Sequence, residues 1–128
     1  MEYNSLLGIK KGLTIPYSPT FVRSKAHYSM LYAGASLKAI YDLAKTKNYT
    51  FLGCNSAGNN AYFIHNSEAQ NFTEVSLENG YVYSSFRESR DENGIQTFIG
   101  GTHRKKLLTS MEFYNTSTQK TEIFTNES

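Results

Sequence analysis

The stretch "GASLKAIYDLAKTKNYTFLGCNSAGNNAYFI", residues 34–64, decides the fold of this chain. In its first half, apolar side chains recur at i, i+3, i+4 and i+7, namely at Leu37, Ile40, Tyr41 and Ala44. This spacing gathers them on one face of a helix. Gly34 or Ser36 can cap the start of that helix, and the basic residues before Asn48 suit its C-terminal end. The stretch therefore predicts a helix at about residues 35–47.

The second half of the stretch predicts two strands. Segments 49–54, "YTFLGC", and 60–64, "NAYFI", are rich in aromatic and β-branched residues. The link between them, which includes Gly58 and Asn59, tolerates the positive φ of a tight turn. We therefore expect the two segments to pair as antiparallel neighbours, with the helix packed on a small sheet in an α/β unit.

The segments outside this stretch carry weaker patterns. Residues 13–29 contain Pro16 and Pro19, which break helices and keep the chain extended, so we interpret the segment as a structured loop. The remaining expected elements are a short strand in "GYVYSSF" (80–86), a charged turn (90–94), a helix over "HRKKLLTS" (103–110) and a strand pair, "MEFYN" (111–115) with "KTEIF" (120–124). The chain is thus divided into an α/β part, 1–66, and a mixed α+β C-terminal extension, 67–128, that packs on the same unit.

Composition and charge restrict the class of protein. The chain has 128 residues, of which 39% are hydrophobic, and its formal net charge is +2. Because the cations are spread along the chain, neither nucleic acid nor a membrane is an expected partner. The single cysteine, Cys54, cannot form an internal disulfide, and no apolar run is long enough for a membrane helix. We expect a cytoplasmic protein.

The sequence gives no strong signal for a metal site or a nucleophile. The histidines lie too irregularly for zinc-ligand spacing, and Cys54 has no CxxC partner, so no metal is expected. Cys54 or Ser56 could be paired with His27 or His65 for nucleophilic catalysis, but there is no GxSxG elbow. A small core residue is the favoured interpretation of Cys54.

Two charged segments are interpreted as surface. The cations Arg104, Lys105 and Lys106 are consecutive on the predicted helix 103–110, and a solvated helix face is the favoured interpretation. The segment "FRESRDENG", residues 86–94, mixes both signs of charge, and such clusters usually lie in solvent. Charge alone therefore assigns no ligand to either segment.

Glu2 and Asn4 are more informative because they stand at the end of an expected strand. In open α/β sheets, ligands bind beyond the carboxyl ends of the strands. A carboxylate at this position can accept a proton from a substrate hydroxyl. The alternative, a solvated loop carboxylate, carries equal weight. Because an apolar strand is expected before Glu2 and the sequence starts one residue earlier, we expect the chain to begin inside a longer fold.

Most of residues 1–100 resemble a known family. The segments "MEYNSLLG", "LTIPYSP", "YAGASLKAIYDLAKTKNYTFLGCNSAGNNAYFI" and "FRESRDENG" are similar to the C-terminal half of bacterial FkbM-type S-adenosylmethionine-dependent methyltransferases. The resemblance implies a partial Rossmann-like methyltransferase sheet. In it, "EYNS" ends the fifth strand, a helix follows, and "YTFLGC" and "NAYFI" form the sixth and seventh strands as an antiparallel hairpin.

The resemblance also implies roles for individual residues. Glu2 would act as the base and Asn4 would orient the acceptor, which is a hydroxyl of a sugar or a similar small molecule. The substrate-binding residues expected with this arrangement are His27, Tyr28, Tyr32, Asn55 and Asn59. The implied activity of the complete fold is transfer of a methyl group to oxygen.

The cofactor of the complete family fold is S-adenosylmethionine, and this chain lacks the motifs that hold it. The family uses a glycine-rich loop after the first strand, an acidic residue after the second and an aspartate motif after the fourth, and none is present. We therefore expect no cofactor for this chain alone and no catalysis without the other half. The alternative is a non-catalytic interaction module or remnant. Under either hypothesis the expected partner is a second copy of the chain or the missing N-terminal half. An alternative of nearly equal weight is a monomer, in which "MEFYN" (111–115) and "KTEIF" (120–124) fold back over the open sheet edge.

Overall fold

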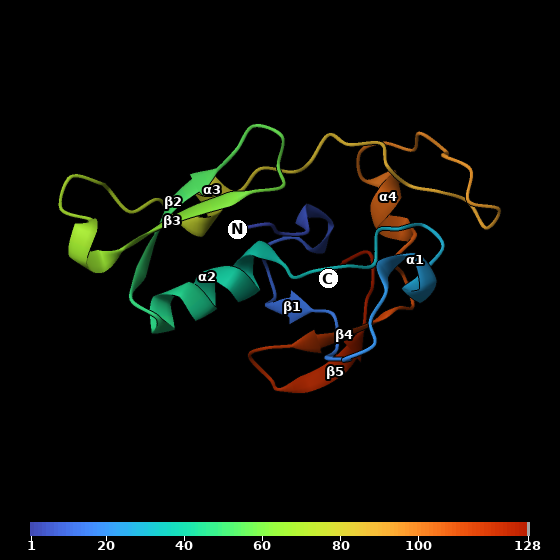
Figure 1. The fold of residues 1–128 in the computed structure, drawn as a ribbon, viewed down its shortest axis with the longest axis horizontal. Helices are drawn as coiled ribbons and strands as arrows, with labels where there is room; N and C mark the ends of the chain where they lie inside the picture. The colour runs from blue at the N-terminus through green and yellow to red at the C-terminus, as the bar shows by residue number, and fades with distance from the viewer. Residues whose placement is uncertain (128) are drawn as a thin grey trace.

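The computed structural model describes residues 1–127 and shows a mixed α/β unit with antiparallel sheets (Figure 1). The elements in chain order are η1 (Ser5–Leu7), β1 (Leu13–Thr14), α1 (Arg23–Ala26), α2 (Leu37–Thr46), β2 (Tyr49–Cys54), β3 (Ala61–His65), η2 (Asn66–Glu68), α3 (Leu77–Gly80), α4 (His103–Lys106), β4 (Glu112–Asn115) and β5 (Lys120–Ile123). In Figure 1, α2, α3 and the β2–β3 hairpin lie on the left, and α1 and α4 lie on the right.

The β2–β3 hairpin confirms the predicted strand pair. Tyr49 lies opposite His65, and the register shifts between Phe51 and Gly53, where a bulge interrupts the ladder. Asn55 closes the connection, because its side-chain Oδ1 accepts hydrogen bonds from the backbone N–H groups of residues 58, 59 and 60. The turn chemistry of one asparagine therefore fixes the hairpin.

Helix α2 confirms the predicted helix. Ser36 caps its start, accepting a hydrogen bond from the Ala39 N–H at 3.2 Å. Leu37 and Ile40 are buried, whereas Tyr41 is half-buried, so the apolar face points toward the hairpin as the spacing predicted. The ring of Tyr41 meets that of Phe51 on β2 edge to face, with centroids 5.8 Å apart.

The second sheet has the order β1-β4-β5, and both of its pairs are antiparallel. It confirms the predicted C-terminal strand pair. The interpretation of 13–29 as loop throughout was wrong, because β1 and α1 lie in it. Strand β1 forms because Leu13 and Thr14 pair with β4 on one side, while Ser36 N–H donates to the Leu13 carbonyl on the other. Hydrogen bonds to residues distant in the chain therefore determine that Leu13 and Thr14 form a strand.

Residues 81–86 form no strand, so the predicted short strand was wrong. Side chains hold this segment in place of a ladder. The hydroxyl of Tyr3 donates to the Val82 carbonyl at 2.6 Å, and that of Tyr81 donates to the Ser5 carbonyl. Burial raises the pKa of both phenols. The segment therefore lies against the N-terminal residues.

Helix α4 is shorter than predicted, and one of its three consecutive cations is buried. It ends at Lys106, and its Arg104 side chain is fully buried, so the surface interpretation was wrong for this residue. Leu108, one helical turn after Arg104, is also fully buried. The arginine thus lies on the inner side of the segment together with the leucine.

Two apolar clusters form the core. The first joins β1, β4 and the segment after α4 through Leu13, Leu31, Tyr32, Leu108, Phe113 and Phe124. The second joins α2 to the hairpin through Tyr3, Leu37, Ile40, Phe51, Ala61 and Leu77. Each cluster takes residues from both 1–66 and 67–128. The N-terminal segment contributes to both, because Leu6 and Leu7 belong to the first and Tyr3 to the second.

No helix within residues 1–127 is both long and apolar enough to cross a membrane. Among the same residues, the structure contains no group of three or more His, Cys, Asp and Glu side chains placed to hold a metal ion.

Candidate functional site

A cavity of about 500 Å³ opens between the N-terminal segment and the chain that follows α3. Its walls come from residues 2–6, from Arg23, from residues 30, 31, 33 and 34, from residues 58–59, and from Ser84, Phe86, Glu88, Arg90 and Gln96. Pockets of this size accept small organic ligands. The cavity brings together residues from five parts of the sequence, and these are described in turn.

Glu2 lies at the rim of this cavity because its backbone is fixed against β3. Glu2 bridges Asn60 in antiparallel fashion, the Tyr3 N–H donates to the Asn59 carbonyl at 3.0 Å, and the Ala61 N–H donates to the Met1 carbonyl at 2.8 Å. Glu2 is exposed and lines the cavity. The backbone of Glu2 is thus held at the cavity, and its exposed side chain is accessible to a ligand hydroxyl there.

Asn4 also lines the cavity, but its side chain is largely committed to the backbone. Its Nδ2 donates to the carbonyls of Leu31 at 2.9 Å and Ala33 at 3.0 Å, and its Oδ1 accepts from the Leu6 N–H at 3.1 Å. Both amide hydrogens are therefore used. Asn4 joins the N-terminal segment to residues 31–33 and shapes the cavity wall, leaving only acceptor capacity on Oδ1.

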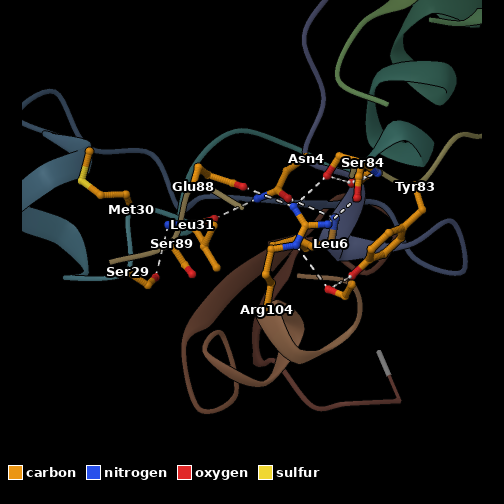
Figure 2. Close-up of polar contacts among 12 residues, drawn as sticks. Asn4, Leu6, Ser29, Met30, Leu31, Tyr83, Ser84, Glu88, Ser89 and Arg104 are labelled. Carbon is orange, nitrogen blue, oxygen red and sulfur yellow. Dashed lines mark hydrogen bonds and ion pairs between the residues drawn. The ribbon is translucent and has the colours of Figure 1, made fainter. Parts of the chain in front are cut away.

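The rear wall is a buried hydrogen-bond network around Arg104 (Figure 2). Its Nη1 lies 3.0 Å from Ser84 Oγ and 3.3 Å from Glu88 Oε2, its Nη2 donates to the Ser84 carbonyl, and its Nε donates to the Gly101 carbonyl. Ser5 completes the network, because its Oγ donates to Ser84 Oγ at 2.9 Å. Figure 2 shows the guanidinium between Glu88 and Ser84.

Two further arginines line the cavity. Arg23 donates through Nε to the Met30 carbonyl, which holds its side chain against the segment after α1. The Arg90 N–H donates to the Ser29 carbonyl at 3.2 Å, so the backbone of Arg90 lies beside the same segment. Within residues 1–127, no carboxylate forms an ion pair with either guanidinium.

The loop that carries Arg90 is held by Asp91. The Oδ1 of Asp91 accepts from the N–H groups of Asn93 at 2.9 Å and Ile95 at 3.0 Å. Arg90 and Gln96 then form an antiparallel bridge at the base of the loop, and both line the cavity. The charged segment 86–94, interpreted as surface from the sequence, therefore contributes Phe86, Glu88 and Arg90 to the cavity walls.

Of the predicted substrate-binding residues, His27 and Tyr28 lie outside the cavity lining. Their rings stack with centroids 4.4 Å apart. The Ser29 N–H donates to His27 Nδ1 at 3.2 Å, and Ser29 Oγ lies 2.7 Å from the same nitrogen. Burial lowers the pKa of His27, and this hydrogen bonding favours the neutral ring.

Tyr32 and Asn55 have structural contacts, whereas Asn59 lines the cavity. Tyr32 is buried in the first apolar cluster, and its hydroxyl donates to the Glu112 carbonyl. Asn55 closes the hairpin turn and donates through Nδ2 to Asn59 Oδ1 at 2.8 Å. The structure therefore brings together Glu2, Asn4 and Asn59 out of the residues that the sequence nominated.

Within residues 1–127, no hydrogen bond joins the nucleophile candidates Cys54 and Ser56 to His27 or His65, whose ring nitrogens contact Ser29 and Ser67 instead. Burial raises the pKa of the Cys54 thiol, which disfavours the reactive thiolate. His65 is exposed, and its Nδ1 lies 2.8 Å from Ser67 Oγ. Neither residue lines the cavity.

Sequence reasoning missed Ser84, Glu88, Arg90 and Arg104. One signal could have placed Arg104, because it precedes Leu108 by four residues and therefore shares its helical face. The other residues lie in irregular chain, where no periodicity shows which side chains point inward. Ser84 is placed by its contact with Ser5, Glu88 by its contact with Arg104, and the Arg90 backbone by its hydrogen bond to Ser29.

The described residues do not fit S-adenosylmethionine. A nucleotide cofactor in an α/β sheet needs a glycine-rich turn at an accessible helix N-terminus. The N-terminus of α2 is closed, because Ser36 is fully buried, accepts from the Leu13 N–H at 2.9 Å and donates to the Lys11 carbonyl at 3.0 Å. We therefore assign no residue of this chain to cofactor binding.

Comparison of the chain with protein-family models, with curated proteins and with solved structures gives no match. The cavity itself can do two things chemically. It can bind a small polar molecule through its amides, arginines and carboxylates, and it can accept a proton at Glu2.

Proposed function

We propose that this chain is the acceptor-binding part of an FkbM-type S-adenosylmethionine-dependent methyltransferase, with a sugar or another small hydroxylated molecule as the acceptor. The chain is inactive alone and contributes to O-methylation within the complete fold. The observation that supports the proposal most is the position of Glu2, an exposed acidic residue whose backbone is fixed beside a cavity of about 500 Å³ that it lines.

The backbone arrangement around Glu2 supports the assignment of these segments to a partial methyltransferase sheet. The resemblance makes residues 2–5 the end of the fifth strand and β2 and β3 the sixth and seventh. In the structure, residues 2–5 form no strand, because Ser5 begins η1, but Glu2 forms an isolated antiparallel bridge with Asn60 just before β3, which pairs with β2 on its other side. Helix α2 packs on the β2–β3 hairpin. It follows residues 2–5 and precedes β2 in the chain, which is the order that the resemblance implies. A partial methyltransferase sheet is thus part of the proposal.

The chemistry assigned to this chain is recognition and proton acceptance. Glu2 accepts the proton of the acceptor hydroxyl, which makes the oxygen a better nucleophile. Asn59 and Gln96 offer amide groups to the other hydroxyls of the ligand. Asn4 positions the wall beside them through its bonds to residues 31 and 33. Binding of the methyl donor belongs to residues other than those of this chain.

A backbone-amide NMR titration of the full chain with methyl glucoside, a neutral polyol, tests this proposal. We expect saturable shifts at cavity residues such as Glu2, Asn59 and Gln96. Glu2→Gln should weaken binding, while Glu68→Gln, which changes an exposed carboxylate on η2, should leave it unchanged. Titration with S-adenosylmethionine should show no saturable binding up to about 1 mM, equivalent to about 4 kcal/mol. Shifts that do not saturate with the sugar, or micromolar binding of the cofactor, would contradict the proposal.

A second candidate function, an interaction module, is favoured by a separate apolar groove of about 390 Å³ between α2 and β3. Leu43 and Tyr62 line it and are each more than half exposed. Beyond Ala61, the outer edge of β3 has no partner strand within residues 1–127. An open edge pairs readily with another strand, and a second copy of this chain can form such a contact about a twofold axis.

Light scattering at micromolar concentration separates this candidate from a monomer. A dimeric mass that Leu43→Lys converts to a monomeric mass would support the interaction module. Tyr17→Lys is the matched control, since Tyr17 is exposed and lies outside the groove. A monomeric mass for the unmodified chain would remove this candidate.

A further inference from the structure

The cavity presents two cations that have no carboxylate partner in the described part of the chain. Arg23 and Arg90 both line it, and neither forms an ion pair within residues 1–127. We infer that the acceptor is a small hydroxylated acid, whose carboxylate or phosphate group is bound by Arg23 and Arg90. This inference rests on the proposed function of the same cavity, and it further specifies that the acceptor carries a negative charge.

Glu88 does not cancel these cations, because it already has a partner. Its Oε2 lies 3.3 Å from Arg104 Nη1, and the Arg104 side chain is fully buried behind the wall. The charge of the Glu88 carboxylate is therefore largely offset by the guanidinium beside it. The other charged residues in the cavity lining are Arg23, Arg90 and Glu2. The sum of their charges is positive, which suits an anionic ligand.

The two arginines are anchored at one short segment of chain. Arg23 bonds to the Met30 carbonyl, and the backbone of Arg90 bonds to the carbonyl of Ser29, the preceding residue. Glu2 is instead anchored opposite Asn60, at the start of β3. The anion is therefore expected near residues 29–30, with the reacting hydroxyl directed toward Glu2. Guanidinium groups are well suited to this task, because their planar N–H donors match carboxylate and phosphate oxygens.

The remaining lining fits the hydroxylated body of such a ligand. Asn59 and Gln96 offer amide donors and acceptors, and Phe86, which is 41% exposed, offers an apolar ring surface. A sugar ring presents hydroxyls at its edge and C–H groups on its faces, so it can use both kinds of contact. The cavity thus has a contact for each part of a sugar acid or a sugar phosphate.

Affinities of the full chain for four probes test this inference. The probes are glucuronate, glucose 6-phosphate, glucose and inorganic phosphate, each followed by NMR at constant ionic strength. We expect glucuronate or glucose 6-phosphate to bind at least tenfold more tightly than glucose. Arg90→Gln should reduce that preference about tenfold and leave glucose binding within twofold. Arg87→Gln is the matched control, because Arg87 is exposed on the same segment and lies outside the cavity lining.

The outcomes separate this inference from the proposed function. Equal binding of glucose and both anionic sugars would overturn the anion site and leave a neutral acceptor. Binding of inorganic phosphate that is sensitive to Arg90→Gln, with no gain from the sugar body, would support the anion site and contradict a sugar acceptor. Tighter binding of glucuronate than of glucose 6-phosphate would support a carboxylate as the anionic group of the acceptor, and the reverse would support a phosphate. No binding of any probe would overturn both.

Discussion

Arg104 Nη1 lies 3.3 Å from Glu88 Oε2, and this pair joins the interior of the protein to its cavity. The arginine side chain is fully buried, whereas the carboxylate is about one-third exposed, with a side-chain accessibility of 36%. The same guanidinium bonds to Ser84, which in turn bonds to Ser5 on the N-terminal segment. One buried cation therefore fixes the loop after α3 against the segment that carries Glu2.

Removal of Arg104 should destabilise the protein strongly. Arg104→Ala leaves the Ser84 and Gly101 carbonyls without their donor, and we expect it to lower the free energy of unfolding by about 3–5 kcal/mol. Lys106→Ala, on the exposed side of the same helix, should change it by less than about 0.5 kcal/mol. Urea unfolding followed by circular dichroism measures both, and similar losses for the two variants would contradict the network.

The inner face of α2 should carry more stability than its outer face. We expect Leu37→Ala and Ile40→Ala each to cost about 2–4 kcal/mol, because both side chains are buried against the hairpin. Leu43→Ala removes a side chain that is 54% exposed, and we expect a loss below about 1 kcal/mol. Chemical unfolding of the three variants compares them directly, and a larger loss at Leu43 than at Leu37 would mean that the other face is buried.

Gly58 should tolerate a side chain less well than Gly94. Both have positive φ, at 77° and 78°, so alanine at either position costs about 1–2 kcal/mol in backbone strain. A Cβ at Gly58 would also meet the Ser84 backbone at 2.7 Å, whereas one at Gly94 meets nothing within 4 Å. Gly58→Ala should therefore cost about 1–3 kcal/mol more than Gly94→Ala in thermal or urea unfolding. Equal costs would show that residues 58 and 84 are farther apart.

His27 should make stability fall in mild acid. Burial lowers the pKa of His27 in the folded protein, so the unfolded chain binds the proton more readily. The contribution is fully present above the unfolded pKa of about 6.5 and is lost as the pH falls below that value toward the lowered folded pKa. Urea unfolding at pH 7.5 and at pH 5.5 tests this. Wild type should lose more stability between the two values than His27→Gln, and an identical loss would contradict the assignment.

Sequence periodicity and composition predicted the helices and strands whose stability depends on residues close together in the chain. The helix at 35–47 and the strand at 49–54 have strong periodicity or β-forming composition, and the structure confirms both within two residues at each end. The C-terminal strand pair was predicted for the same reason. These segments specify their structure through neighbours that are close in sequence.

Long-range contacts decide the parts that the sequence did not predict. Strand β1 exists because Leu13 pairs with Asn115, which is far away in the chain. The segment after α3 has no ladder and is fixed by tyrosine hydroxyls and by Arg104. The residues of the candidate site also fall into those that the sequence indicated and those that it did not. Glu2 stood out because of its place near a strand end, whereas Arg90 was obscured by neighbouring charges of both signs.

A crystal structure of the full chain with glucuronate tests the central claim most directly. The account predicts the carboxylate of the sugar between Arg23 and Arg90 and one of its hydroxyls within hydrogen-bond distance of the Glu2 carboxylate. The sugar in the groove between α2 and β3, or in the cavity with no hydroxyl near Glu2, would contradict it.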